Sequence, residues 1–92
     1  MKRICLDTSA YSHFMRGHVD VHAIITSASI VEIPVVVLGE LRMGFRLGSK
    51  AAENSRRLDA FCSEPVVEVI DIDDETATHY ADIVADLRKR GH

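Results

Sequence analysis

The fold is indicated first by the stretch Ile4-Cys5-Leu6-Asp7-Thr8-Ser9-Ala10 near the N-terminus. Three apolar residues followed by an acid are typical of a short buried strand that ends at the carboxyl edge of a sheet. Ligands of open α/β sheets bind at that edge. Thr8 and Ser9 suit the cap of a following helix, whose free N–H groups favour anions. The stretch therefore predicts either metal-assisted phosphate chemistry or plain helix capping around Asp7.

A second acid, Glu40, lies within a helix that we expect to begin at Pro34. At 100° per residue, the positions flanking Glu40 on its own face are all apolar or glycine: Val36, Val37, Met43, Gly44 and Leu47. A carboxylate among such neighbours is costly unless a cation or a hydrogen-bond donor meets it. Glu40 is thus either a metal ligand or a buried structural residue that pairs with an internal arginine or caps a neighbouring backbone.

Apolar periodicity and capping signals divide the chain into alternating strands and helices. Val35, Val36 and Val37 favour a strand by propensity, but Pro34 suits the first turn of a helix better than a central strand. We expect strands at Arg3–Leu6, Ile30–Ile33 and Val66–Ile70, and helices at Ser9–Met15, Val19–Ala28, Pro34–Leu47, Lys50–Cys62 and Asp74–Arg90. This alternation predicts the α/β class, with a parallel sheet in a three-layer α/β/α sandwich.

Length and composition are those of one small globular domain. The 92 residues are 47% hydrophobic and 27% charged, which is ordinary for a globular chain. No apolar run approaches the ~20 residues of a membrane span, and Asp7 interrupts the first one too early for a signal peptide. We therefore expect a cytoplasmic protein without membrane association, in which Cys5 and Cys62 are reduced core thiols.

Charge is distributed unevenly along the chain, although the net charge is only −3. Between residues 42 and 57 there is one acid, Glu53, and five basic residues: Arg42, Arg46, Lys50, Arg56 and Arg57. Residues 68–86 carry seven acids and no Lys or Arg. The basic stretch could meet a phosphate backbone, or both stretches could simply be solvated helix faces.

The histidines do not indicate a zinc site. His18 and His22 have i, i+4 spacing, but no Glu follows His18 as in zinc proteases, and the preceding Gly17 favours a helix start at His18. We expect His13, His79 and His92 to be surface residues.

Three ordered stretches together resemble the PIN-domain ribonucleases, particularly the VapC-type toxins of toxin–antitoxin pairs. They are residues 4–11 (ICLDTSAY), residues 33–45 (IPVVVLGELRMGF) and residues 77–88 (ATHYADIVADLR), the last followed by Arg90-Gly91. The resemblance implies strand order 3-2-1, which gathers the carboxyl edges into one acidic cleft. It further implies hydrolysis of RNA phosphodiester bonds with Mg²⁺ or Mn²⁺, which prefer carboxylate oxygens.

In that scheme Asp7 and Glu40 are the catalytic residues and metal ligands. Thr8 and Ser9 support Asp7 or a phosphate, and Arg42 and Arg46 are candidates for RNA binding. The implied partners are an RNA substrate, a cognate antitoxin in the grooves between the helices, and a second copy of the chain. The helical faces around Leu41 and Phe45 are the expected homodimer surface.

The chain departs from the family pattern at its C-terminus. PIN domains continue after Arg90-Gly91 into a fourth strand that ends in further acids. We therefore expect residues 1–92 to be a single PIN-like domain that is incomplete there, and inactive or nearly so with Asp7 and Glu40 alone. Loss of that strand would also leave strand one open to pairing with another copy or to aggregation.

Other functions compete with this interpretation. The chain could be a non-catalytic remnant that binds antitoxin or dimerises with intact toxin. A haloacid-dehalogenase-type phosphatase would need a second acid two residues after Asp7, where this chain has Ser9. A response-regulator receiver is also disfavoured, because it needs acids just before its phosphorylated Asp.

Overall fold

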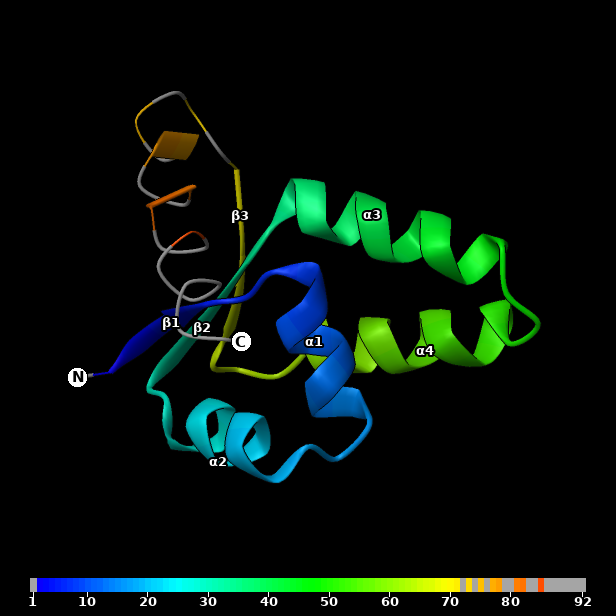
Figure 1. Ribbon diagram of the computed structural model, residues 1–92, viewed down its shortest axis with the longest axis horizontal. Coiled ribbons are helices and arrows are strands. Elements are labelled where there is room, and N and C mark those ends of the chain that lie inside the picture. Colours follow the sequence, from blue (N-terminus) through cyan, green and yellow to red (C-terminus); the bar gives the residue numbers. More distant parts are fainter. Residues whose placement is uncertain are drawn as a thin grey trace.

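The computed structural model describes residues 2–71 and, further along, residues 73, 75, 77, 78, 81, 82 and 85. Within this part, three parallel strands form one sheet: β1 (Arg3–Cys5), β2 (Ile30–Pro34) and β3 (Val67–Ile70). β2 lies at the centre and pairs with both neighbours (Figure 1), so that Glu32 is level with Cys5 on one side and Glu68 on the other. The α/β class, the parallel pairing and the strand order are therefore confirmed.

Each crossover between strands contains two helices. α1 (Thr8–Met15) and α2 (Val19–Ser27) connect β1 to β2, and α3 (Val35–Arg46) and α4 (Ala51–Cys62) connect β2 to β3. The turn between α1 and α2 contains Gly17 at a φ of +76°, a left-handed conformation that glycine adopts without a steric penalty. Figure 1 shows α3 and α4 as an antiparallel hairpin that projects away from the sheet.

The predicted element boundaries are displaced by one residue at several places. Pro34 is the last residue of β2, paired with Ile70, and α3 begins at Val35. The expectation that Pro34 opens the helix is wrong, because a strand's final residue can lack an N–H without interrupting the ladder. Val35–Val37 are helical despite their strand propensity, since Val37 is completely buried against the core.

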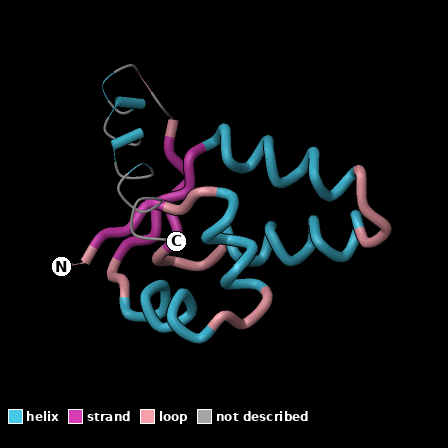
Figure 2. Tube along the Cα trace, in the orientation of Figure 1, coloured by secondary structure: helices cyan, strands magenta, loops and turns pink. Residues whose placement is uncertain are grey.

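The described helices cover one face of the sheet. Val31 and Ile33 alternate with Glu32 along β2 and so share a face, where both are buried. One apolar cluster joins Ile33 to α1, α3 and α4, and a second joins Val31 to α1 and α2. The β1–β2 and β2–β3 crossovers run in the same direction across the sheet. Because such connections are usually right-handed, their helices lie on the same side of the sheet (Figure 2).

The third layer of the predicted sandwich depends on the final helix. The predicted helix Asp74–Arg90 falls largely outside the described residues, as do His79 and His92. Residues 75, 77, 78, 81, 82 and 85 are helical, and the N–H of Ala77 donates to the carbonyl of Asp73 at 2.8 Å. Within the part that is described, no helix is long and apolar enough to cross a bilayer.

Candidate active site

Asp7 lies where β1 ends and α1 begins. Its Oδ1 accepts a hydrogen bond from the N–H of Ala10 at 2.7 Å, so Asp7 is the N-cap of α1. The capping interpretation of this residue is confirmed, with Asp7 rather than Thr8 or Ser9 as the cap. Within the described part of the chain, Oδ2 of this half-buried carboxylate accepts no hydrogen bond. Capping therefore occupies one oxygen and leaves the other available to a ligand.

Thr8 and Ser9 occupy the first turn of α1, directly beside Asp7. Thr8 is half-buried and Ser9 is exposed. The carbonyl of Ser9 accepts a hydrogen bond from Nδ1 of His13 at 2.7 Å. The acid therefore lies beside the first turn of a helix, whose free N–H groups can attract anions.

Glu40 lies on α3 between a buried row and an exposed row of apolar side chains. Val37 and Leu41 belong to the core, whereas Val36 and Met43 are 51% and 61% exposed. Glu40 itself is exposed, and no described residue forms an ion pair with it. The alternative of a buried structural Glu40 is wrong, because the described residues leave this face of α3 uncovered.

Asp7 and the start of the helix that carries Glu40 lie at the same edge of the sheet. Since Cys5 is level with Glu32 in the parallel ladder, Asp7 is level with Pro34, where α3 begins. Glu40 is six residues further along, or about 9 Å along the helix axis. Asp7 thus stands at the edge itself, and Glu40 lies further along the helix that starts there.

The donor atoms suit a hard divalent cation. Carboxylate oxygens are preferred by Mg²⁺ and Mn²⁺, and two carboxylates with several waters can hold one such ion weakly. Among the described residues, no three or more His, Cys, Asp or Glu side chains gather into a metal-binding group. By donor chemistry alone, Asp7 and Glu40 would suit such an ion as part of a ligand set.

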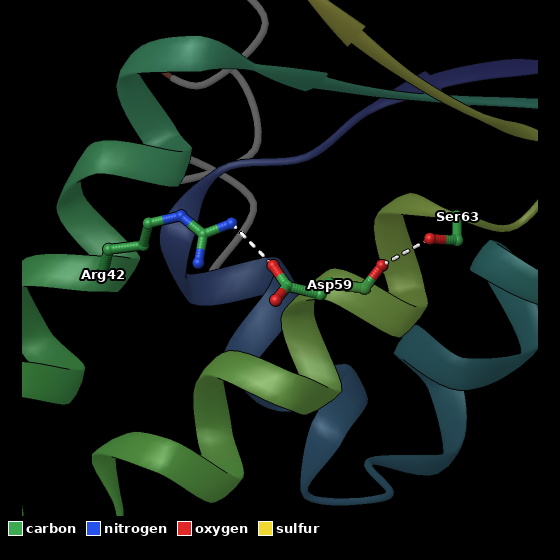
Figure 3. A network of polar contacts seen from close by, with 3 residues as sticks. All are labelled: Arg42, Asp59 and Ser63. Carbon is green, nitrogen blue, oxygen red and sulfur yellow. Dashed lines mark hydrogen bonds and ion pairs between the residues drawn. The ribbon is translucent and has the colours of Figure 1, made fainter.

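Arg42 and Arg46 have different surroundings on α3. Nη2 of Arg42 donates to Oδ1 of Asp59 on α4 at 2.9 Å, and the hydroxyl of Ser63 donates to the carbonyl of Asp59 at 2.8 Å (Figure 3). Arg46 is exposed in the last turn of the helix. Arg42 thus links the two helices of the hairpin, while Arg46 has no acidic partner among the described residues.

The basic stretch occupies this same hairpin. Each of its five members is exposed: Arg42, Arg46, Lys50, Arg56 and Arg57. The hairpin therefore carries a concentration of positive charge that the net charge of the chain conceals.

A groove lies between α1, α3 and α4; grooves between the helices were expected from the resemblance, but their lining residues were not. Its volume is about 270 Å³, and it is lined by Tyr11, Ser12, Met15, Arg16, Phe45, Asn54 and Arg57. The ring of Tyr11 packs edge-on against Phe61, with ring centroids 5.3 Å apart. Burial raises the pKa of Tyr11 above its ordinary value, while the nearby guanidinium of Arg57 acts in the opposite direction.

The expected dimer surface around Leu41 and Phe45 is wrong. Leu41 is only 4% exposed in the core cluster, and Phe45 packs against that cluster. The exposed apolar side chains of α3 are instead Val35, Val36 and Met43, with Leu47 just beyond the helix end. The dimer surface suggested by the resemblance therefore does not coincide with the exposed apolar side chains of α3.

Both cysteines are free thiols, as predicted. Burial, assisted by the negative charges of Glu32 and Asp7, raises the pKa of Cys5 to about 11. Burial also raises the pKa of Cys62, which packs beside the core. Both shifts favour the neutral thiol, which agrees with a structural rather than a reactive role.

The histidines near the α1–α2 turn act locally. His18 is the N-cap of α2, with its Nδ1 accepting from the N–H of Val21 at 3.4 Å, as its predicted position at a helix start requires. His13 is half-buried rather than fully exposed, and its ring lies edge-on to that of His18 at 5.3 Å. His22 stacks on Phe14.

Comparison with known proteins agrees with this fold. The PIN domain family matches residues 4–91, so the chain belongs to the PIN domain family. PIN domains are generally nucleases, and these nucleases generally use divalent metal ions. The comparison with curated proteins gave no match.

Among solved structures, the chain is similar to one in the crystal structure of VapBC2 from Rickettsia felis bound to a DNA fragment from their promoter. The identity is 23% and the TM-score is 0.66, over 100% of this chain and 70% of that chain. The two chains therefore share a fold.

Proposed function

We propose that this chain is a VapC-type toxin: a metal-dependent endoribonuclease that acts in the cytoplasm and is restrained by an antitoxin. Membership of a family that is generally nucleolytic supports the reaction class. The fold shared with a chain of the VapBC2 complex supports a two-component assembly. The observation that supports the proposal is Asp7 at the sheet edge, whose cap leaves one carboxylate oxygen without a hydrogen bond from any described residue.

Asp7 and Glu40 would hold Mg²⁺ or Mn²⁺ in this scheme. When bound, the ion supplies charge neutralisation at the phosphate and activation of water. Asp7 would contribute its second carboxylate oxygen, and the hydrogen bond from Ala10 to the first oxygen holds the carboxylate in position. The first turn of α1 would present Thr8 and Ser9 to a phosphate oxygen. The basic α3–α4 hairpin, including Arg42 and Arg46, would attract the RNA backbone.

Manganese binding tests this proposal without depending on turnover. Electron paramagnetic resonance of Mn²⁺ should show weak binding to the 92-residue chain, and Asp7→Asn or Glu40→Gln should each reduce it. Glu53→Gln, which removes an exposed acid on α4, is the matched control and should leave binding unchanged. Mn²⁺ binding that is indifferent to both Asp7 and Glu40 would refute the proposed ligand set.

RNA cleavage by this chain should be weak and should stop when EDTA is added. The reason is that the described residues bring no group of three or more metal-ligating side chains together. The same observation favours a second candidate function, a non-catalytic module that binds antitoxin or intact toxin. Partner binding without any Mn²⁺ affinity would select that alternative.

A further inference from the structure

The groove between α1, α3 and α4 contains a buried polar side chain without a partner. Tyr11 is the most buried of the lining residues, with 3% of its surface exposed. Its ring packs on Phe61, but its hydroxyl forms no hydrogen bond with any residue that the structure describes. In the same part of the chain, every completely buried polar side-chain atom has a partner. The hydroxyl is therefore accessible, and the groove that Tyr11 lines provides the access.

Positive charge lies close to this hydroxyl. Arg16 and Arg57 are exposed, line the groove and form no ion pair with any described residue. Burial raises the pKa of Tyr11, and the charges of Arg57 and Arg42 act against that shift, so both guanidinium groups lie within electrostatic reach of the hydroxyl. Arg42 is engaged by Asp59, which leaves Arg16 and Arg57 available to a ligand. No acid is among the described residues that line the groove.

Two neutral polar side chains add further donors. Ser12 on α1 and Asn54 on α4 are half-buried in the lining, and neither side chain makes a hydrogen bond within the described part of the chain. A hydroxyl and an amide can each donate to an oxyanion. With Tyr11, Arg16 and Arg57, the groove thus has five donor-bearing side chains in its lining. Such a set fits a ligand that has several oxygen atoms and more than one negative charge.

We propose that this groove binds a small phosphate monoester that carries an apolar or aromatic group. A phosphate monoester has a charge of about −1.5 to −2 near pH 7 and three acceptor oxygens, which match two guanidinium groups and the neutral donors. A carboxylate has only two oxygens and a single charge, so it would leave donors unused. Half-buried Met15 and Phe45 also line the groove and would contact the apolar group. The volume of about 270 Å³ is slightly below that of sites for drug-sized ligands, which favours a small molecule.

Single-stranded RNA fits this groove less well. Proteins bind such RNA by stacking its bases on accessible aromatic faces beside a charged track. The ring of Tyr11 is almost completely buried and packs on Phe61, so it offers no free face to a base. Asp7 and Glu40 do not line the groove. The inference therefore does not depend on the nuclease proposed above.

Nuclear magnetic resonance titration of the whole ¹⁵N-labelled chain in metal-free, phosphate-free buffer tests the proposal. The probe is phenyl phosphate, and the comparison ligands are benzoate and an oligouridine without a terminal phosphate. Phenyl phosphate should shift the Nε–H resonances of Arg16 and Arg57 to saturation, and benzoate should bind at least about tenfold more weakly. Tyr11→Phe removes only the hydroxyl and should weaken phenyl phosphate binding about fivefold. Arg57→Gln should weaken it at least about tenfold.

Arg56→Gln is the matched control, because Arg56 is the exposed neighbour on α4 that does not line the groove. It should change binding by less than about twofold, as expected for a charge outside the contact. Ser12→Ala serves as a second variant if circular dichroism shows that Tyr11→Phe is unfolded. Equal effects of the Arg56 and Arg57 variants, equal affinity for benzoate, unchanged binding by folded Tyr11→Phe, or no saturable shift would each overturn the proposal.

The remaining outcomes separate this site from the candidate metal site. Oligouridine that displaces phenyl phosphate would assign the groove to RNA and overturn the small-molecule ligand. Phenyl phosphate binding that requires Mn²⁺ and is lost in Asp7→Asn would place the phosphate at the sheet edge and also overturn the proposal. Arg57-dependent binding to the metal-free chain, in a protein that binds no Mn²⁺, would support the groove assignment and refute only the nuclease.

Discussion

Oδ1 of Asp7 lies 2.7 Å from the backbone nitrogen of Ala10, so one carboxylate both begins α1 and stands at the candidate metal site. The two roles use different properties of the side chain. Capping needs an oxygen acceptor, whereas metal binding also needs negative charge. Substitutions at Asp7 can therefore separate the effect on folding stability from the effect on metal binding.

Asp7→Asn should preserve the N-cap of α1 but weaken Mn²⁺ binding. Asparagine caps helices about as well as aspartate, so the free energy of unfolding should change by less than about 0.5 kcal/mol, while Mn²⁺ binding falls. Asp7→Ala should lose both, at a cost of about 1 kcal/mol in stability. Urea denaturation beside Mn²⁺ titration measures the two effects, and equal destabilisation by both variants would contradict the dual role.

Glu40→Gln should affect binding and not folding. Glu40 is exposed and has no ion-pair partner among the described residues, so the stability should stay within about 0.5 kcal/mol of the original. A thermal melt checks this, with Glu53→Gln as the control on α4. A loss of several kcal/mol would show that Glu40 is structural.

Leu58→Ala should destabilise the protein by about 2–5 kcal/mol. Leu58 is completely buried in the cluster that joins α4 to Ile33 and Val37, and its truncation leaves a cavity there. Leu47→Ala is the same substitution at a side chain that is 86% exposed, and it should cost less than about 0.5 kcal/mol. Denaturant titration of the two variants measures the difference, and similar values would refute this core.

The Arg42–Asp59 ion pair should contribute little to stability. The two side chains are 43% and 64% exposed, so solvent screens their attraction. A double-mutant cycle with Arg42→Ala and Asp59→Ala should give a coupling energy below about 1 kcal/mol that shrinks in high salt. A coupling of several kcal/mol, unchanged by salt, would be inconsistent with this exposed geometry.

Cys5 should make the stability depend on pH in the alkaline range. Its pKa is raised from 9.0 to about 11, chiefly by burial, so the folded protein favours the neutral thiol. The resulting stabilisation is complete below pH 9 and is lost as the pH rises through 11. Comparison with Cys5→Ala isolates the effect, since the stability difference between the two proteins should narrow between pH 9 and 11. A difference that stays constant across this range would contradict a buried thiol.

Much of the fold follows from local patterns in the sequence. The short apolar strands, the capping signals and the apolar periodicity of the helices predicted a parallel sheet and most boundaries to within one residue, whereas the strand order was implied by the family resemblance. Asp7 was singled out as a carboxylate directly after an apolar strand; the structure makes it the N-cap of α1, and its role as a metal ligand stays a prediction.

The errors have a common physical cause, which is that periodicity does not tell which apolar face of a helix becomes covered. In α3 both faces are apolar, and only tertiary packing decides that Leu41 is buried while Met43 is exposed. The lining of the groove between α1, α3 and α4 was not predicted for a similar reason. Its lining residues Tyr11, Phe45 and Arg57 come from three separate helices, and no local pattern connects them.

The direct passage from β2 into α3 at Pro34 has a consequence for the length of this segment. No loop residue separates the strand from the helix, so an inserted or deleted residue cannot be absorbed between them. One extra residue before Glu40 would turn its carboxylate by about 100° around the helix axis and shift it by about 1.5 Å. The number of residues between β2 and Glu40 therefore matters as much as the identity of Glu40. An insertion at this joint should abolish metal binding although every candidate ligand is still present.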